Sequence, residues 1–400
     1  MRKNLAVNSF NYTKKDFMKS LLKSRSLSSG FALFSMFFGA GNLIFPLALG
    51  HFAGDHNLYA MIGLLITAVI VPFLGVIAVL LYDGSYERFF ARLGKWPGFF
   101  MAFSIITLIG PLGCTPRCIA LSFSTVKAFF PGTSSVLFSG TACLLILLFT
   151  LRKNRTIEIL GRVLTPVLLA GLGFIIYKGF TADGAIQSLG ISRLSLFFLG
   201  LKEGYNTMDL LASFFFSSTV ISMLKNSEKE QGETGHVKRT LKATAIGAGL
   251  LSVVYLGFSY IAALHASTIT IEGKEQIFTA LALKVAGPAA GIVLCVTVAL
   301  TCLTTAIALI CAFTDFLQKE VLKNKVRYEV VLVTSLIATF CMSNFEFQGI
   351  SAFLGPILEV CYPALIVLTI ANIAFRLLDF KPIKRLVFLA FLCSAVMYFM

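Results

Sequence analysis

The chain has 400 residues, of which 57% are hydrophobic and only 13% are charged, and its mean hydropathy is +0.86. Soluble domains carry about 25% charged residues, so this composition excludes an ordinary soluble protein and indicates an integral membrane protein. The net charge is +15, but the basic residues fall in the breaks between apolar runs, so they report membrane topology and not binding to nucleic acid.

Apolar runs divide the chain. Residues 1–29 are basic and hold no separate apolar core, which predicts a cytoplasmic tail and not a cleavable signal peptide. Eleven apolar runs follow, at about 30–48, 57–82, 99–129, 134–151, 157–179, 204–224, 240–265, 285–317, 327–343, 350–373 and 386–400. We therefore expect an all-α integral membrane protein with about eleven transmembrane helices, the last of them short.

Lysine and arginine are concentrated in every second loop. Besides the tail, most of them lie near 88–95, 152–155, 225–242, 319–327 and 376–385. Because cytoplasmic loops of membrane proteins are enriched in these residues, the alternation predicts a multi-pass protein of the inner (plasma) membrane with a cytoplasmic N-terminus.

The first apolar run, GFALFSMFFGAGNLIFPLALG, contains residues that interrupt a helix. Gly39, Ala40 and Gly41 give a flexible backbone, Asn42 competes for backbone hydrogen bonds, and Pro46 removes a donor. A broken transmembrane helix exposes N–H and C=O groups that can hold an anionic group and a cation at mid-membrane. The alternative is an unbroken helix whose small residues allow close helix packing.

A second interruption follows five helices later. Helix 6 begins at residue 204 with the polar run GYNTMD, and helices 3 and 8 are the two longest runs. Because five is odd, two such repeats enter the membrane from opposite sides. We expect repeats at 30–180 and 204–373, joined by an extracellular connection at 181–203, with a basic loop and a final helix at 374–400.

Three charged residues lie within apolar runs: Arg117 in helix 3, Asp209 in helix 6 and Glu359 in helix 10. Charges inside a membrane are costly, so each is a functional candidate. Either Arg117 forms a structural ion pair with Asp209 or Glu359, or these charges take part in coupling transport to an ion.

Helix 8 carries Thr301, Thr304 and Thr305 close to one face. Membrane threonines usually bond back to their own helix. Facing the carbonyls of a broken helix, however, the same hydroxyls would form a site of neutral oxygens suited to a monovalent cation.

Other functional classes lack their motifs. The sequence has no GxxxxGK[ST] phosphate-binding loop and no cluster of histidines and carboxylates spaced for a catalytic metal, which argues against an enzyme and against a bound cofactor. A channel would need a continuous polar path, whereas the polar residues here are isolated.

The motifs together resemble one family. GFALFSMFFGAGNLIFPLALG, IGPLGCTPR, GYNTMDLLASFFF, LTCLTTAIALI and GPILEVCYPALIVL are similar to the characteristic blocks of the branched-chain amino acid transport system II carriers, which are cation-coupled symporters. The resemblance implies a five-plus-five inverted-repeat core of the leucine-transporter type, with helices 1 and 6 discontinuous. It also implies import of leucine, isoleucine and valine by alternating access, usually coupled to sodium.

The resemblance also implies roles for particular residues. The backbone N–H groups around Gly39, Ala40 and Gly41 would bind the substrate carboxylate, with Asn42 beside it. The helix 6 residues Tyr205, Asn206, Thr207 and Asp209 would face the substrate's ammonium group and side chain. Sodium would be held by the carbonyls of Ser35, Phe38 and Thr301 and the hydroxyls of Thr304 and Thr305.

Two features depart from the family pattern. Leu47 follows Pro46 where many relatives have a second proline, and the usual twelve helices are here about eleven. A proton-coupled symporter of another amino acid, with Asp209 and Glu359 as candidate proton carriers, is the alternative function.

Overall fold

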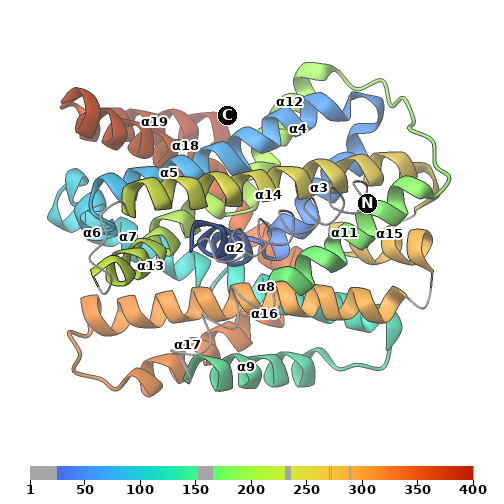
Figure 1. The fold of residues 1–400 in the computed structure, drawn as a ribbon, viewed down its shortest axis with the longest axis horizontal. Helices are drawn as coiled ribbons and strands as arrows, with labels where there is room; N and C mark the ends of the chain where they lie inside the picture. The colour runs from blue at the N-terminus through green and yellow to red at the C-terminus, as the bar shows by residue number, and fades with distance from the viewer. Residues whose placement is uncertain are drawn as a thin grey trace, which may run out of the picture.

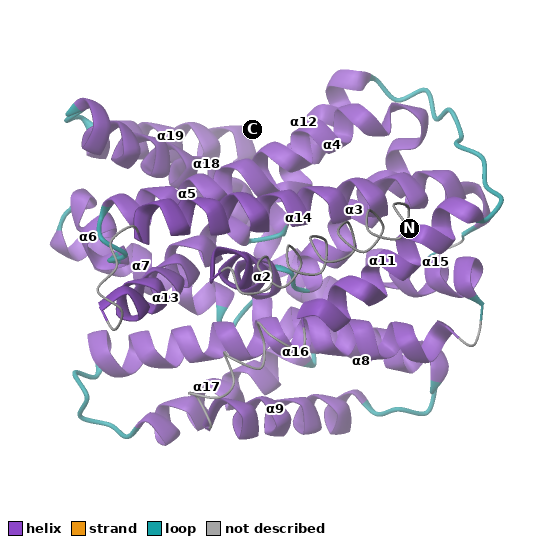
Figure 2. Cartoon of the chain, viewed as in Figure 1, coloured by secondary structure: helices purple, strands orange, loops and turns teal. Residues whose placement is uncertain are grey.

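The structure is a computed structural model that describes residues 25–151, 165–229, 236–269, 271, 273–287 and 290–399. The predicted tail up to residue 24, the start of the fifth apolar run and the basic loop at 152–155 lie outside the described residues. Helices, turns and loops make up the described part, which contains no strand (Figure 2). The all-α prediction is therefore confirmed.

The first half of the chain forms the five predicted spans, and three of them consist of two α-helices each. They are α2 (Arg25–Phe37) with α3 (Ala40–Ala53); α4 (Asn57–Leu65) and α5 (Val71–Leu81), joined by the π-helical η2 (Ile66–Ile70); α7 (Lys95–Ile109) with α8 (Cys114–Phe129); α9 (Ser135–Leu151); and α11 (Thr165–Thr181). Short helices η1 (Gly54–His56), α6 (Tyr86–Phe90) and η3 (Ala91–Leu93) lie in the connections.

The second half repeats this plan and adds one helix. Its spans are α12 (Arg193–Asn206) with α13 (Asp209–Lys229); α14 (His236–His265); α16 (Ala290–Phe316), extended by the π-helical η7 (Leu317–Val321); α17 (Tyr328–Ser343); α18 (Glu346–Leu378); and α19 (Ile383–Phe399). Between α14 and α16 lie η5 (Ala266–Thr268), η6 (Lys274–Gln276) and α15 (Ile277–Ala286).

Five helical stretches of the described chain are long and apolar enough to cross a membrane on their own. They are Ala40–Leu81, Lys95–Phe129, Val237–Thr268, Val296–Val321 and Glu346–Leu378. The remaining apolar helices are shorter, and among them are α2 and the apolar part of α13, which are halves of broken helices.

Helix 6 begins earlier than the sequence predicted. The boundary was expected at residue 204, yet α12 starts at Arg193, where the Ser192 hydroxyl accepts a bond from Ser195 N at 3.2 Å as an N-cap. Hydropathy did not predict this half-helix, because it contains the charged residues Lys202 and Glu203. Each has a partner in the fold, Glu359 at 3.1 Å and Lys274 at 2.5 Å respectively.

The first broken helix lies in the centre of the bundle. Helix α14 packs along both α2 and α3, α12 packs on α4, α13 on α5 and α16 on α8 (Figure 1). Every residue from 33 to 50 is buried, so the broken backbone is enclosed by protein. This is the condition under which a broken helix is tolerated at membrane depth.

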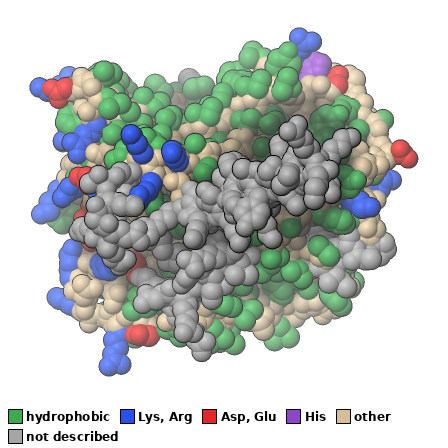
Figure 3. All heavy atoms as spheres, in the orientation of Figure 1, with side chains coloured by type: hydrophobic (Ala, Val, Ile, Leu, Met, Phe, Trp, Pro, Cys, Tyr) green, Lys and Arg blue, Asp and Glu red, His purple; other side chains and the backbone are tan. Residues whose placement is uncertain are grey.

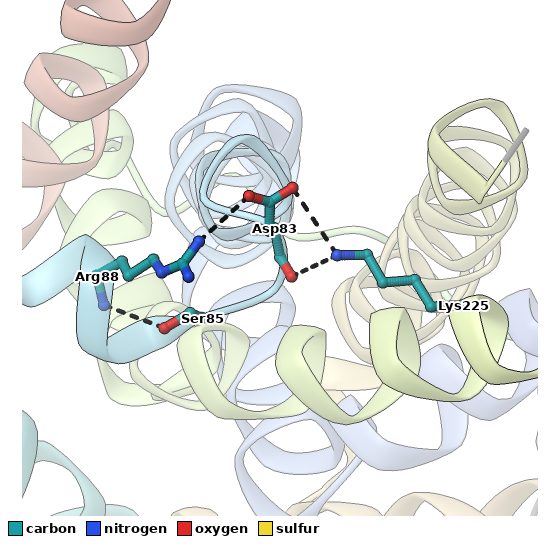
Figure 4. A network of polar contacts seen from close by, with 4 residues as sticks. All are labelled: Asp83, Ser85, Arg88 and Lys225. Atoms are coloured by element: carbon teal, nitrogen blue, oxygen red, sulfur yellow. Dashed lines mark hydrogen bonds and ion pairs between the residues drawn. The ribbon is translucent and has the colours of Figure 1, made fainter.

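Basic side chains gather at one end of the bundle. Figure 3 shows Lys and Arg spheres along the left edge, where Figure 1 places α6, the α16–α17 connection and the start of α19. At this end Asp83 caps the α5–α6 turn: it accepts Arg88 Nη1 at 3.4 Å on its carboxylate and Lys225 Nζ at 2.7 Å on its carbonyl (Figure 4). These contacts join α5, α6 and α13.

Candidate substrate and ion site

The two helix breaks touch each other. We call Phe38–Gly39 the helix-1 break and Thr207–Met208 the helix-6 break. A Cβ added at Gly41 would lie 3.1 Å from the Cα of Thr207, so glycine allows the two backbones to meet. Met208 has a left-handed φ of 64°, which sharpens the second break at a cost of about 1 kcal/mol. The sequence predicted both breaks, and their contact places four helix ends at one point.

Asn42 connects the helix-1 break to two other helices. Its Oδ1 accepts the N–H of Gly39 at 3.1 Å, and its Nδ2 donates to Asp209 Oδ2 at 2.6 Å. The same Nδ2 contacts the hydroxyl of Tyr255 on α14, which in turn donates to Asp209 Oδ2 at 3.2 Å. Asp209 is 2% exposed and begins α13, where the helix dipole favours a carboxylate.

One of the predicted sodium ligands on helix 8, Thr305, contacts the other side of the same break. Thr305 Oγ1 donates to the carbonyl of Phe38 at 3.0 Å, and a Cβ at Gly39 would lie 2.9 Å from Thr305 Cγ2. Since the N–H of Gly39 is given to Asn42, it does not close a helical bond onto the carbonyl of Ser35. The Ser35 hydroxyl is buried and has no hydrogen-bond partner in the described chain.

Two of the helix 8 threonines bond back to their own helix. Thr301 Oγ1 donates to the carbonyl of Thr297 at 2.7 Å, and Thr304 Oγ1 donates to the carbonyl of Thr301 at 2.9 Å. The structure thus joins Thr305 to the break, while the hydroxyl of Thr304 and the carbonyl of Thr301 satisfy each other. All three threonines are buried. The donor set consists of neutral oxygens, the type that suits a weakly held monovalent cation.

Arg117 is buried and forms no ion pair with an acidic side chain of the described residues, so of the two alternatives the ion pair with Asp209 or Glu359 is wrong. Its Nη1 donates to the carbonyl of Asn206 at 2.9 Å, and its Nε and Nη2 reach Ser351 Oγ at 3.3 and 3.1 Å. The rings of Phe45 and Phe347 lie 5.2 and 5.3 Å from its guanidinium carbon. Arg117 therefore connects α8 to the end of α12 by a hydrogen bond, to α18 by hydrogen bonds and a cation–π contact, and to α3 by a cation–π contact.

Helix geometry separates Glu359 from Arg117. Glu359 is eight residues beyond Ser351 on α18, and a rise of 1.5 Å per residue separates the two by about 12 Å. Its side chain is 37% exposed and pairs with Lys202, so Glu359 is not a buried charge.

Helix 6 residues near the break point in different directions. The ring of Tyr205 stacks on Tyr362 at 4.7 Å, and the Tyr362 hydroxyl accepts the N–H of Leu210 at 3.0 Å. The amide of Asn206 donates to Glu203 at 3.4 Å, and Thr207 Oγ1 bonds the carbonyl of Gly204 at 2.8 Å. Sequence reasoning missed Tyr255 and Tyr362, because a tyrosine in an apolar run carries no signal that separates it from core residues.

A cavity of about 630 Å³, which we call the vestibule, lies beside Asn206 at the end of α12, one residue before the helix-6 break. Its lining includes Phe45, Arg117, Asn206, Phe347 and Ser351, together with residues of the η5–η6 segment. The Glu203–Lys274 pair ties α12 to η6 beside it. The η6 residue Lys274 lines the vestibule, and η6 comes directly before α15, which Figure 1 places on the side of the bundle opposite α6.

Comparison with known proteins identifies the family. A model of branched-chain amino acid transport proteins matches residues 22–400. A putative branched-chain amino acid carrier protein of Staphylococcus epidermidis is 32% identical over 378 residues, covering 89% of this chain and 83% of the relative. The branched-chain amino acid transport system 2 carrier protein of Pseudomonas aeruginosa is 31% identical over 360 residues, covering 88% and 81%.

Solved structures share the fold at low identity. MhsT in complex with L-phenylalanine has a TM-score of 0.63 at 15% identity, covering 94% of this chain and 98% of that chain. Mhp1, a nucleobase-cation-symport-1 family transporter with bromovinylhydantoin bound, has a TM-score of 0.56 at 13% identity, covering 94% and 91%. These neighbours confirm a leucine-transporter-type fold, and the resemblance inferred from the motifs is also confirmed.

Family and fold neighbours are transporters, which confirms that the protein is not an enzyme. The chain, a multi-pass membrane protein that transports amino acids, belongs to the branched-chain amino acid transport protein family.

Proposed function

We propose that this protein imports leucine, isoleucine and valine by sodium-coupled symport with alternating access. One observation supports the proposed coupling to sodium: the Thr305 hydroxyl lies 3.0 Å from the carbonyl of Phe38 at the helix-1 break. In that position a sodium ion could bind oxygens of both α16 and the end of α2, so that binding would fix the break relative to helix 8.

The substrate carboxylate would bind at the start of α3. The N–H groups of Ala40 and Gly41 open this helix, where backbone donors lack intrahelical acceptors and the dipole is positive. Asn42 fixes the turn through Gly39, and it thereby preorganises these donors. Sodium at the carbonyl side of the break and a carboxylate at the amide side would stabilise each other.

Alternating access would change the packing around the contact between the helix-1 and helix-6 breaks. The helix-1 and helix-6 breaks are in backbone contact, and each separates two half-helices that can tilt independently. The vestibule extends from one end of the bundle as far as Arg117 and Asn206, so that a tilt of the half-helices would be needed to open it onto the helix-6 break. The Tyr205–Tyr362 stack offers apolar surface beside the break for a branched side chain.

Localisation follows from charge. The basic end of the bundle (Figure 3) would face the cytoplasm under the positive-inside rule, and the vestibule would then open to the outside. This orientation in the inner (plasma) membrane, with the N-terminus inside, agrees with import down a sodium gradient.

Leucine uptake into proteoliposomes with and without an inward sodium gradient tests this function. We expect uptake that requires the gradient and survives a protonophore. In Thr305→Val the sodium concentration for half-maximal leucine binding should rise by roughly tenfold or more, since a ligand oxygen is lost. Thr305→Ser should restore it. Thr369→Val, at a buried threonine that bonds Leu365 O on α18, is the matched control and should behave as wild type.

Proton coupling is the second candidate, and Asp209 favours it. This buried carboxylate lies at the helix-6 break and is shared by Asn42 and Tyr255. A proton gained or lost there would alter the contact between α3, α13 and α14. Uptake that ignores sodium, collapses with a protonophore and disappears in Asp209→Asn would replace the sodium assignment by this one.

A further inference from the structure

A second cavity, of about 600 Å³, lies at the basic end of the bundle between η3 and the start of α19. We call it the basic cleft. Four of its lining residues are cationic, namely Arg92, Lys381, Lys384 and Arg385, and no acidic residue lines it. None of the four forms an ion pair with another described residue. None of the residues that line the cleft lies at a helix break or lines the vestibule.

Arg92 is held in place but keeps unused hydrogen-bonding capacity. Its guanidinium carbon lies 3.6 Å from the ring centroid of Phe375 on α18, so one face of the group is stacked. Its Nε is buried and donates no hydrogen bond to the described chain. A planar, fixed guanidinium with free N–H groups is suited to bind the oxygens of a phosphate.

The opposite wall supplies further positive charge. Lys384 extends from the first turn of α19 toward η3, because its Nζ lies 3.7 Å from where a Cβ at Gly94 would be. Ile383 beside it is buried and anchors that turn, while Arg385 is exposed. The N-terminal dipole of this 17-residue helix adds to the positive potential.

The surroundings of the cleft are apolar and exposed. Trp96 at the start of α7 is 67% exposed, Leu378 at the end of α18 is 79% exposed and Phe388 on α19 is 61% exposed. A tryptophan beside basic residues is typical of a membrane–water interface. Free phosphate would account for the cations, whereas a lipid would account for both the cations and the apolar rim.

We propose that the basic cleft binds the phosphate-bearing headgroup of an anionic phospholipid, with its acyl chains along the apolar surface of α19. The headgroup bridges η3 and α19, and so it fastens the final helix to the connection between the second and third spans. The lipid acts as a structural ligand at the cytoplasmic end, separate from substrate and ion.

The purified full-length chain in detergent tests the proposal. Native mass spectrometry and thermal unfolding are followed while phosphatidylglycerol or phosphatidylcholine of the same acyl chains is added. The variant Lys384→Gln/Arg385→Gln removes two cations from the cleft. Lys325→Gln/Arg327→Gln, at exposed positions in the α16–α17 connection of the same end, is the charge-matched control.

We expect one tightly bound phosphatidylglycerol that raises the unfolding temperature, and binding roughly tenfold or more weaker in the cleft variant than in the wild type or the control. Equal binding of phosphatidylcholine, an unchanged affinity in the cleft variant, or an equal loss in the control would overturn the proposal. Displacement of the lipid by millimolar inorganic phosphate would also overturn it, in favour of a site for soluble phosphate. Because these measurements involve neither leucine nor sodium, they are independent of the proposed transport function.

Discussion

Asn42 is the side chain on which the helix-1 break depends most. It accepts from Gly39 and donates to Asp209, and it contacts Tyr255, so one small amide orders three helices. One of these interactions is with the buried carboxylate of Asp209, and another is with Tyr255, which also bonds that carboxylate. Hydrogen bonds to a charged group contribute more to stability than bonds between neutral groups. The residue is therefore expected to serve both stability and substrate binding.

Replacing Asn42 separates these two roles when a second buried asparagine is used for comparison. Asn42→Ala should lower the free energy of unfolding by about 2–3 kcal/mol, because Gly39 and Asp209 lose a partner, and should abolish leucine binding. Asn372→Ala removes an amide on α18 whose Oδ1 accepts a hydrogen bond from the Tyr82 hydroxyl at 2.7 Å. It should destabilise by a similar amount yet retain leucine binding. Chemical denaturation and equilibrium binding measure the two effects, and equal loss of binding in both variants would contradict the assignment.

Because Arg117 bonds Ser351 and not Glu359, we expect the fold to be more sensitive to replacement of Ser351 than to replacement of Glu359. Ser351→Ala removes the acceptor of two guanidinium bonds and should destabilise the fold by about 1–2 kcal/mol. Glu359→Gln should cost less than about 1 kcal/mol, since its pair with Lys202 is exposed. A larger effect of Glu359→Gln on unfolding would restore a structural role for that carboxylate.

At the scale of elements, the close approach of two breaks makes Gly41 sensitive to size. A methyl group there would meet the Cα of Thr207 at 3.1 Å and its carbonyl oxygen at 3.3 Å, and backbone atoms cannot rotate away. We expect Gly41→Ala to hold the two breaks apart and lower the rate of uptake at least tenfold, by analogy with other overpacked contacts costing 1–3 kcal/mol. Gly249→Ala on α14, where no atom lies within 4 Å, is the control and should keep the wild-type rate.

The sequence was sufficient for elements with a strong local signal. Eleven apolar runs correspond to helices, and the break at Gly39 was predictable because glycine, asparagine and proline occur together inside an apolar run. The start of α12 was not predictable from hydropathy, since Lys202 and Glu203 are charged but have partners from distant segments. Likewise, the partners of Arg117 and the role of Tyr255 depend on how helices are rotated against each other, which no single segment encodes.

At the scale of the whole molecule, charge and cavities divide the bundle into two unlike ends. One end carries the basic loops (Figure 3) and the residues that line the basic cleft, whereas the vestibule is lined by residues of η6, next to α15 at the other end (Figure 1). Between them the helix breaks are enclosed, so a substrate would reach them only when one end opens. An asymmetric molecule of this kind needs a fixed orientation in the membrane, and we predict that orientation from the basic loops.

That orientation can be measured with one cysteine placed at each end. In a variant whose native cysteines are replaced by serine, Gln187→Cys lies in the exposed connection before α12, and Lys325→Cys lies in the exposed connection between α16 and α17. Because lysine and arginine are retained on the cytoplasmic side, a membrane-impermeant thiol reagent added to intact cells should label Gln187→Cys and leave Lys325→Cys unlabelled. After the cells are opened, both should react, which controls for accessibility. Labelling of Lys325→Cys in intact cells would reverse the topology, and the vestibule would then be the cytoplasmic entrance.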